Sequence, residues 1–191
     1  MPRYANTVTL KVKGNRGPSA GPQNRRALID AAREIFATDG LNAPLSLIAR
    51  RAGVGQGSLY RHFPDRLALA VAVFDDNIGD LEAGVADPRT TLDELLERVI
   101  SQALTSTTLI DMMFAHRDDE RAIHLQTRVR ALLAAIVERE KVAGRIRAEV
   151  AVDDVLLAIS MLAGILARSE ADARPEVARR AWGILHTAFA P

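Results

Sequence analysis

The chain has 191 residues, of which 48% are apolar, so it can hold one large domain or two small ones around a sizeable core. Only 4% of the residues are aromatic, while Ala and Leu are abundant, a composition that favours packed helices over sheets. Cysteine is absent, which excludes disulfides and thiolate metal sites.

Charge is divided unevenly along the chain, although the formal net charge is only +1. Residues 1–74 hold 11 Lys and Arg against four Asp and Glu, whereas residues 75–191 hold 14 against 20. This asymmetry is expected when only the first part of a protein meets a polyanion. No apolar run reaches the roughly 18 residues of a membrane span, and the first ten residues lack the apolar centre of a signal peptide. We therefore expect a cytoplasmic protein without a membrane partner.

Residues 1–23 are rich in Pro, Gly and basic residues, which predicts a flexible basic arm. The alternation of apolar residues over 8–12 could form a strand, but no second strand is evident to pair with it. Three side chains of the arm are candidates for contacts with phosphates or a minor groove: Lys11, Lys13 and Arg16.

Apolar residues then recur at helical spacing in four segments, which predicts helices over residues 24–38, 44–53, 56–63 and 65–83. Gly40 and Gly53 supply the left-handed residue that ends a helix. Pro44 is acceptable at a first-turn position, where its missing N–H costs nothing.

Further helices are predicted after the break at 87–88. A capping box over 91–94 precedes an apolar stripe that extends to residue 104. A short helix over 109–116, a long one over 120–143 ended by Gly144, and two more from about residues 153 and 175 follow. The sequence therefore predicts an all-α protein of eight or nine helices.

The stretch over 45–69 reads LSLIARRAGVGQGSLYRHFPDRLAL and has the pattern of two short helices joined by a glycine turn. Leu59 and Phe63, four residues apart, would anchor the second helix to the core. Val54 would fill the corner between the helices, and Gly53 would take a positive φ at the turn. Such a helix-turn-helix unit lays its second helix in a DNA major groove.

With the apolar face inward, the helical repeat turns polar and basic residues of the second helix outward. Gln56 can pair bidentately with adenine, and Arg61 can do so with guanine or bind a phosphate. Gly57 lets the backbone approach the groove. Ser58, Tyr60 and His62 suit phosphate oxygens, and Arg66 would clamp a further phosphate. Each side chain alone is explained as well by packing or a solvated surface; their combination indicates DNA binding.

Residues 24–74 resemble the DNA-binding region of the tetracycline-repressor (TetR) family. The resemblance rests on Ile48-Ala49, Ala52-Gly53-Val54, Gly57-Ser58-Leu59-Tyr60, His62-Phe63, Arg66 and Leu69. It implies a bacterial regulator, most often a repressor, that is a homodimer and releases DNA when its larger helical domain binds a small molecule. It also implies DNA contacts at these residues: Ser46, Gln56, Gly57, Ser58, Tyr60, Arg61, His62 and Arg66.

Three positions depart from the family pattern. Pro44 stands where many members have a Thr that caps the helix and touches a phosphate. Gly55 replaces a Ser or Thr and gives the recognition helix a weaker cap. Arg66 replaces the usual Lys, keeping the charge but changing the geometry.

We expect residues 24–70 to form the DNA-binding domain and residues 71–191 to form an effector-binding and dimerisation domain. A palindromic site needs two recognition helices one DNA turn apart, roughly 34 Å, so dimerisation belongs to the mechanism. The last two helices are the expected interface, although their apolar faces could instead be buried within one chain. The expected interface residues are Ile159, Leu162, Leu166, Trp182, Leu185 and Phe189.

An effector pocket is expected around the methionine-rich segment near residue 112, because methionine adapts to varied apolar shapes. The alternative is that these residues fill the core. The candidate pocket residues are Phe74, Leu109, Met112, Met113, Phe114 and His116. The effector would be small and apolar or amphipathic, and we expect neither a cofactor nor a metal.

Three other functions fit the sequence less well. An enzyme is disfavoured because the four histidines lack metal-binding spacing and no phosphate loop or nucleophile elbow is present. An architectural DNA-binding protein would need basic charge over more of its surface. A helical interaction protein with a degenerate motif would show no DNA binding at low salt.

Overall fold

The computed structural model describes residues 21–100, 116, 118–170 and 172–191. Every regular element in these ranges is a helix, which confirms the predicted all-α class. The helices are α1 (Gly21–Thr38), α2 (Leu45–Arg51), α3 (Gln56–His62), α4 (Arg66–Val85), α6 (Glu120–Val142), α7 (Val152–Ala167) and α8 (Arg174–Thr187), with a further helical segment over 92–100.

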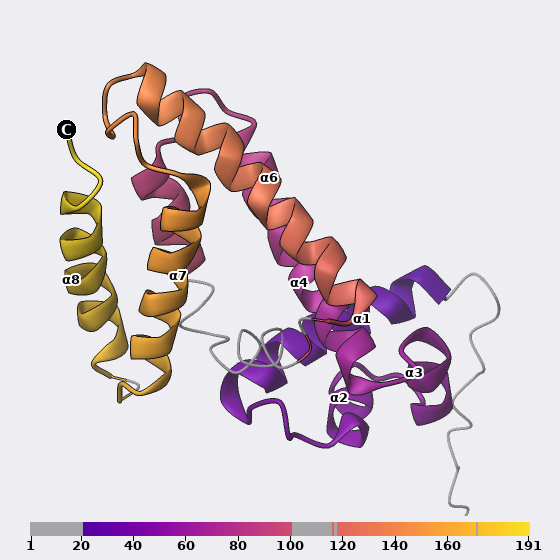
Figure 1. Ribbon diagram of the computed structural model, residues 1–191. Helices are drawn as coiled ribbons and strands as arrows, with labels where there is room; N and C mark the ends of the chain where they lie inside the picture. Colours follow the sequence, from indigo (N-terminus) through magenta and orange to yellow (C-terminus); the bar gives the residue numbers. More distant parts are fainter. Residues whose placement is uncertain (1–20, 101–115, 117, 171) are drawn as a thin grey trace, which may run out of the picture.

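The helices gather at two ends of an elongated molecule (Figure 1). α1, α2 and α3 pack together at one end against the first half of α4. α7 and α8 lie side by side at the other end, and α6 runs along α4 between the two groups. None of the helices in the described part of the chain is both long and apolar enough to cross a membrane.

Two separate apolar clusters form the interior. In the first, Leu28, Ile48, Leu59 and Leu69 are completely excluded from solvent. The second is built from the segment 92–100, α6, α7 and α8. Its most deeply buried side chains are Leu95, Leu96, Ile136, Val155, Leu166 and Ala178.

α4 belongs to both clusters. Val73 lies in the first cluster and Leu81 in the second, so the change from one core to the other falls inside a continuous helix. The two ends of the molecule are therefore joined by a helix rather than by a loop.

Helix ends follow the predicted turn chemistry. Gly40, Gly53 and Gly144 have φ values of 73°, 67° and 68°, as expected for left-handed residues that follow helices. The carboxylate of Asp65 caps α4 by accepting the N–H of Ala68 at 2.6 Å. α1 begins at Gly21, three residues earlier than predicted, so the predicted arm enters the described structure only through its last three residues.

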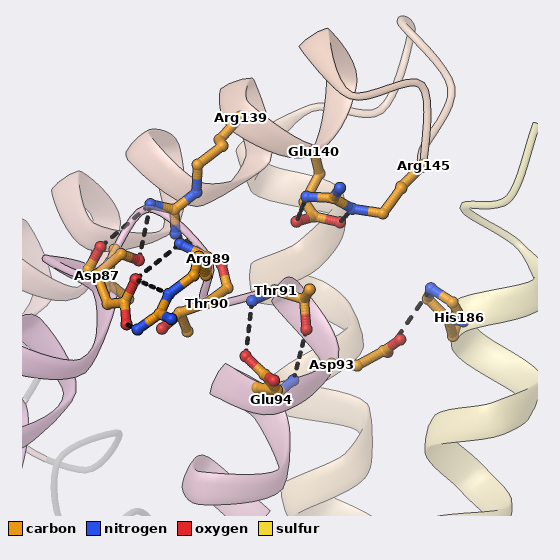
Figure 2. Close-up of polar contacts among 11 residues, drawn as sticks. Asp87, Arg89, Thr90, Thr91, Asp93, Glu94, Arg139, Glu140, Arg145 and His186 are labelled. Carbon is orange, nitrogen blue, oxygen red and sulfur yellow. Dashed lines mark hydrogen bonds and ion pairs between the residues drawn. The ribbon is translucent and has the colours of Figure 1, made fainter.

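The capping box over 91–94 is also confirmed (Figure 2). Thr91 donates its N–H to Glu94 at 3.0 Å, and Glu94 donates its N–H to the Thr91 hydroxyl at 3.2 Å. Arg139 of α6 donates to backbone carbonyls of Asp87 and Thr90 and so holds the connection that follows α4 (Figure 2). These contacts fix the entry to the second core.

Candidate nucleic-acid interface

Helix α3 presents one buried and one exposed face. Leu59 is fully buried and Phe63, which follows the helix, is 2% exposed. Tyr60 is 47% exposed, and Gln56 and Arg61 are exposed with it. The short helix is therefore anchored through its apolar residues while its polar side chains point away from the protein.

The turn that precedes α3 is tightly hydrogen-bonded. Val54 donates its N–H to the carbonyl of Ala49 at 2.9 Å, and Gly53 donates to Arg50 at 3.1 Å. Val54 is half-buried against the first cluster, as predicted for the corner position. Pro44 and Gly55 stand at the N-caps of α2 and α3, and neither provides a side-chain cap. The two departures in the sequence thus leave both N-termini without a capping side chain.

The eight predicted contact residues differ in exposure. Ser58, His62 and Arg66 are half-buried, and the other five are exposed: Ser46, Gln56, Gly57, Tyr60 and Arg61. Ser46 lies in the first turn of α2, whereas six of the others belong to α3. Their contacts with DNA stay a prediction.

Arg66 has a role inside the protein that the sequence did not reveal. Its Nη1 donates to the carbonyl of Ala43 at 2.6 Å and also to the carbonyl of Leu41. The guanidinium thereby ties the start of α4 to the loop between α1 and α2. No sequence signal marks this contact, because the acceptors are backbone atoms.

Several arginines near this surface are neutralised by carboxylates. Arg51 pairs with Glu34, and Asp76 pairs with arginines of α1. Arg50 and Arg61 form no ion pair among the described residues. Arg50 is exposed at the end of α2 and is a further candidate for binding a phosphate. The sequence prediction did not include it, although a basic residue in the first helix of the motif is a signal for such a contact.

Ion pairs also join α4 to α6. Arg121 lies 3.2 Å from the Asp65 carboxylate that caps α4. Arg128 binds Glu82 at 2.7 Å and also binds Asp75. The hydrogen bond from Arg128 lowers the pKa of Glu82 below its ordinary value. Ion pairs therefore hold α6 against α4, the helix that begins directly after the helix-turn-helix motif.

Four of the six predicted interface residues are buried within a single chain. Leu162, Leu166, Trp182 and Phe189 are at most 8% exposed and belong to the second core of a single chain. Their side chains pack within the chain, and their part in a dimer interface stays a prediction.

Ile159 and Leu185, the other two, are half-buried against the same core. The indole N–H of Trp182 donates to the Asp93 carboxylate at 2.8 Å, which explains how its polar atom is satisfied inside the chain.

The predicted effector residues are only partly within the described structure. Leu109, Met112, Met113 and Phe114 lie outside the described residues. Phe74 packs against the first cluster, on the DNA-binding side, and His116 is exposed. Neither lines the grooves found near α6 and α8, so the pocket stays a prediction.

Comparison with known proteins decides the family. Residues 28–73 match the model described as bacterial regulatory proteins, tetR family. Residues 87–187, more than half of the chain, match the C-terminal domain of SbtR-like transcriptional regulators. The chain belongs to the TetR family. TetR-family proteins are DNA-binding transcriptional regulators and not enzymes, which agrees with the motif analysis.

Individual curated relatives match less than half of the chain. The transcriptional activator FasR of Mycolicibacterium smegmatis is 40% identical over 83 residues, which cover 42% of this chain and 37% of the relative. The repressor LfrR of the same organism is 38% identical over 90 residues, 44% of this chain and 46% of the relative. The chain spans less than half the length of the curated relatives it matches.

Solved structures match along almost the whole chain. A TetR transcriptional regulator from Streptomyces coelicolor has a TM-score of 0.64 and 28% identity, covering 87% of this chain and 98% of that one. A regulatory protein TetR from Rhodobacter sphaeroides has a TM-score of 0.67, with 88% of this chain and 100% of that one covered. At 16% identity, the second likeness shows the fold alone.

Proposed function

We propose that this TetR-family regulator is a cytoplasmic repressor that binds a palindromic operator as a homodimer and responds to a small apolar or amphipathic effector. The observation that supports the DNA-binding part of this proposal best is the division of α3. Leu59 is fully buried beneath a surface on which Gln56, Tyr60 and Arg61 are exposed. A helix anchored in this way can enter a major groove without distorting its own domain.

The roles of the exposed residues follow from their chemistry. Gln56 is the first residue of α3, the end at which a recognition helix meets base edges. Its amide reads adenine, whereas the Tyr60 hydroxyl binds a phosphate oxygen and carries no sequence information. Ser46, Ser58 and His62 supply further backbone contacts at the margins of the helix.

This division of roles is tested by fluorescence anisotropy with operator and random duplexes, the operator being obtained from genome-wide mapping of bound fragments. Gln56→Ala should change which bases are preferred, while Tyr60→Phe should weaken binding to every sequence by about 1 kcal/mol. Gln126→Ala, an exposed glutamine on α6, is the matched control and should change neither. Equal losses on operator and random DNA for Gln56→Ala would contradict its reading role, and uniform coating of all fragments would indicate an architectural protein.

For the dimer, we propose a surface different from the buried residues expected from the sequence. On α7, Leu157, Met161 and Ile165 follow at four-residue spacing and are 60%, 57% and 49% exposed. Ile184 on the adjacent α8 is 68% exposed. Apolar side chains gathered in this way on helices mark a surface that gains stability when a partner covers it.

Sedimentation equilibrium tests this surface. Met161→Glu should shift the protein toward monomer and weaken operator binding, because a charge at the centre of the stripe cannot be paired in the interface. Val142→Glu provides the control, since Val142 is 83% exposed but lies at the end of α6. An unchanged dimer in Met161→Glu, or an equal loss in Val142→Glu, would place the interface elsewhere.

The regulatory part of the proposal rests on the SbtR-like second domain and its match to regulators. An effector acts by stabilising a state in which the two recognition helices have the wrong spacing. The relatives include both an activator and a repressor, so whether this protein represses or activates transcription is tested directly. In a reporter fused to the mapped promoter, loss of the protein should raise expression; a fall would show an activator.

A further inference from the structure

A groove of about 510 Å³ lies where the DNA-binding helices meet α6. Its walls come from α1, the end of α3, the first half of α4 and the first turns of α6, which converge in this part of the molecule (Figure 1). The volume falls within the range of small-molecule sites, roughly 300–1,000 Å³, and such sites favour domain boundaries.

The floor of the groove is apolar and firmly held. Phe63 and Leu125 are each 2% exposed, and Val71, which also lines the groove, packs against the first cluster. Two alanines of α4, Ala68 and Ala72, also line the groove, and their short side chains fill little of it. A hydrocarbon chain or an aromatic ring is the kind of group that gains free energy from covering such a surface.

The rim of the groove carries nitrogen-bearing side chains. The guanidinium carbon of Arg25 lies 5.5 Å from the centroid of the Phe63 ring, directly over the apolar floor. The imidazole of His62 is 6.3 Å from the same ring, and His124 of α6 also lines the groove. Arg25 forms no ion pair among the described residues. Its charge is therefore available to a molecule lying on Phe63.

The other charged residues of the lining have partners or a local stabilising field. Asp75 pairs with Arg128, and Arg121 is held by two carboxylates. Glu120 is in the first turn of α6, where the positive end of the helix dipole stabilises its negative charge. Arg25 is thus the full charge most directly placed against the apolar floor.

We propose that this groove binds an amphipathic monocarboxylate, with its apolar body on Phe63, Val71 and Leu125 and its carboxylate at Arg25. A guanidinium is well suited to a carboxylate because it offers planar, paired N–H donors. The bound molecule contacts both the end of α3 and α6. Its effect on DNA binding rests on the proposed function, whereas the binding site itself does not.

Isothermal titration calorimetry of the full chain tests the site with decanoate as the probe, and with decanol and decylamine as head-group controls. Decanoate should bind with about one molecule per chain, decanol more weakly and decylamine not at all. Arg25→Gln should weaken decanoate binding about tenfold, the loss expected for one charge-assisted contact, while Arg25→Lys should recover part of it. Arg26→Gln is the matched control, because Arg26 is adjacent and pairs with Asp76 but does not line the groove.

A second variant tests the floor independently of charge. Ala68→Leu should fill the space above Phe63 and reduce binding of decanoate, while far-ultraviolet circular dichroism verifies that the variant is folded. Absence of decanoate binding, equal binding of decylamine, or binding unchanged by both Arg25→Gln and Ala68→Leu would overturn the proposal. None of these results would contradict operator binding, so they count against the groove proposal alone. Loss of operator recognition in a protein that still binds decanoate would count against the proposed function alone.

Discussion

Gly53 and Gly57 differ in backbone conformation although neither is crowded. Gly53 has a φ of 67° in the turn before α3, whereas Gly57 lies inside α3 with a negative φ. A Cβ added at either position would meet no heavy atom within 4 Å. Alanine substitution at these two sites therefore isolates the backbone conformation from any clash.

The expected effects have opposite signs. Gly53→Ala should lower the free energy of unfolding by about 1–2 kcal/mol, the cost of a left-handed L-residue. Gly57→Ala should raise it by roughly 0.5 kcal/mol, because alanine is the better helix former. Gly57→Ala should nevertheless weaken DNA binding, since the added methyl group stands on the exposed face of α3 and keeps the backbone away from the groove.

Urea unfolding followed by circular dichroism measures both changes, with all variants at one protomer concentration because a dimer is stabilised by mass action. Fluorescence of Trp182, the single tryptophan, follows the second core separately. The argument from backbone conformation would be refuted if Gly53→Ala were as stable as the original protein, or if Gly57→Ala lost as much stability as Gly53→Ala.

Two further predictions concern charges. The side-chain hydrogen bond from Arg121, helped by the backbone N–H of the same residue, lowers the pKa of Asp119 from 3.8 to about 2. The stabilisation from this carboxylate is complete above about pH 4 and is lost as pH falls toward 2. Asp119→Asn should therefore flatten the pH dependence of urea unfolding in that window, and a parallel curve would contradict this. Arg145→Met should lower the free energy of unfolding, because it leaves the Glu140 carboxylate, which is 3% exposed, without its partner (Figure 2). Arg89→Met, which removes an exposed ion pair, should leave the free energy of unfolding nearly unchanged, and equal effects of the two substitutions would argue against burial as the cause.

The DNA-binding half was predictable because its signals are local. The turn at Gly53, the anchors Leu59 and Phe63, and the corner residue Val54 are fixed by spacings of a few residues. The structure places all four as the sequence predicted. Backbone geometry and a helical repeat are enough to define such a unit.

The proposed dimer surface could not be predicted from local signals in the same way. α7 carries apolar residues on more than one face, so its periodicity does not distinguish Leu162 and Leu166, which are buried, from Met161 and Ile165, which are exposed. The orientation of the helix depends on how it packs against α6 and α8, which is a long-range property. Arg66 shows the same limit on a smaller scale, because the carbonyls that it binds lie 23 and 25 residues earlier in the chain.

The uninterrupted course of α4 has a mechanical consequence. Its 20 residues make a rod about 30 Å long, so tilting one end by about 10° moves the other by roughly 5 Å. In the proposed homodimer the two displacements would oppose each other, and the distance between the two recognition helices would change by up to roughly 10 Å, close to the major-groove width of about 12 Å. In that dimer, a modest rearrangement in the second core would be amplified enough to put both subunits out of register with the double helix.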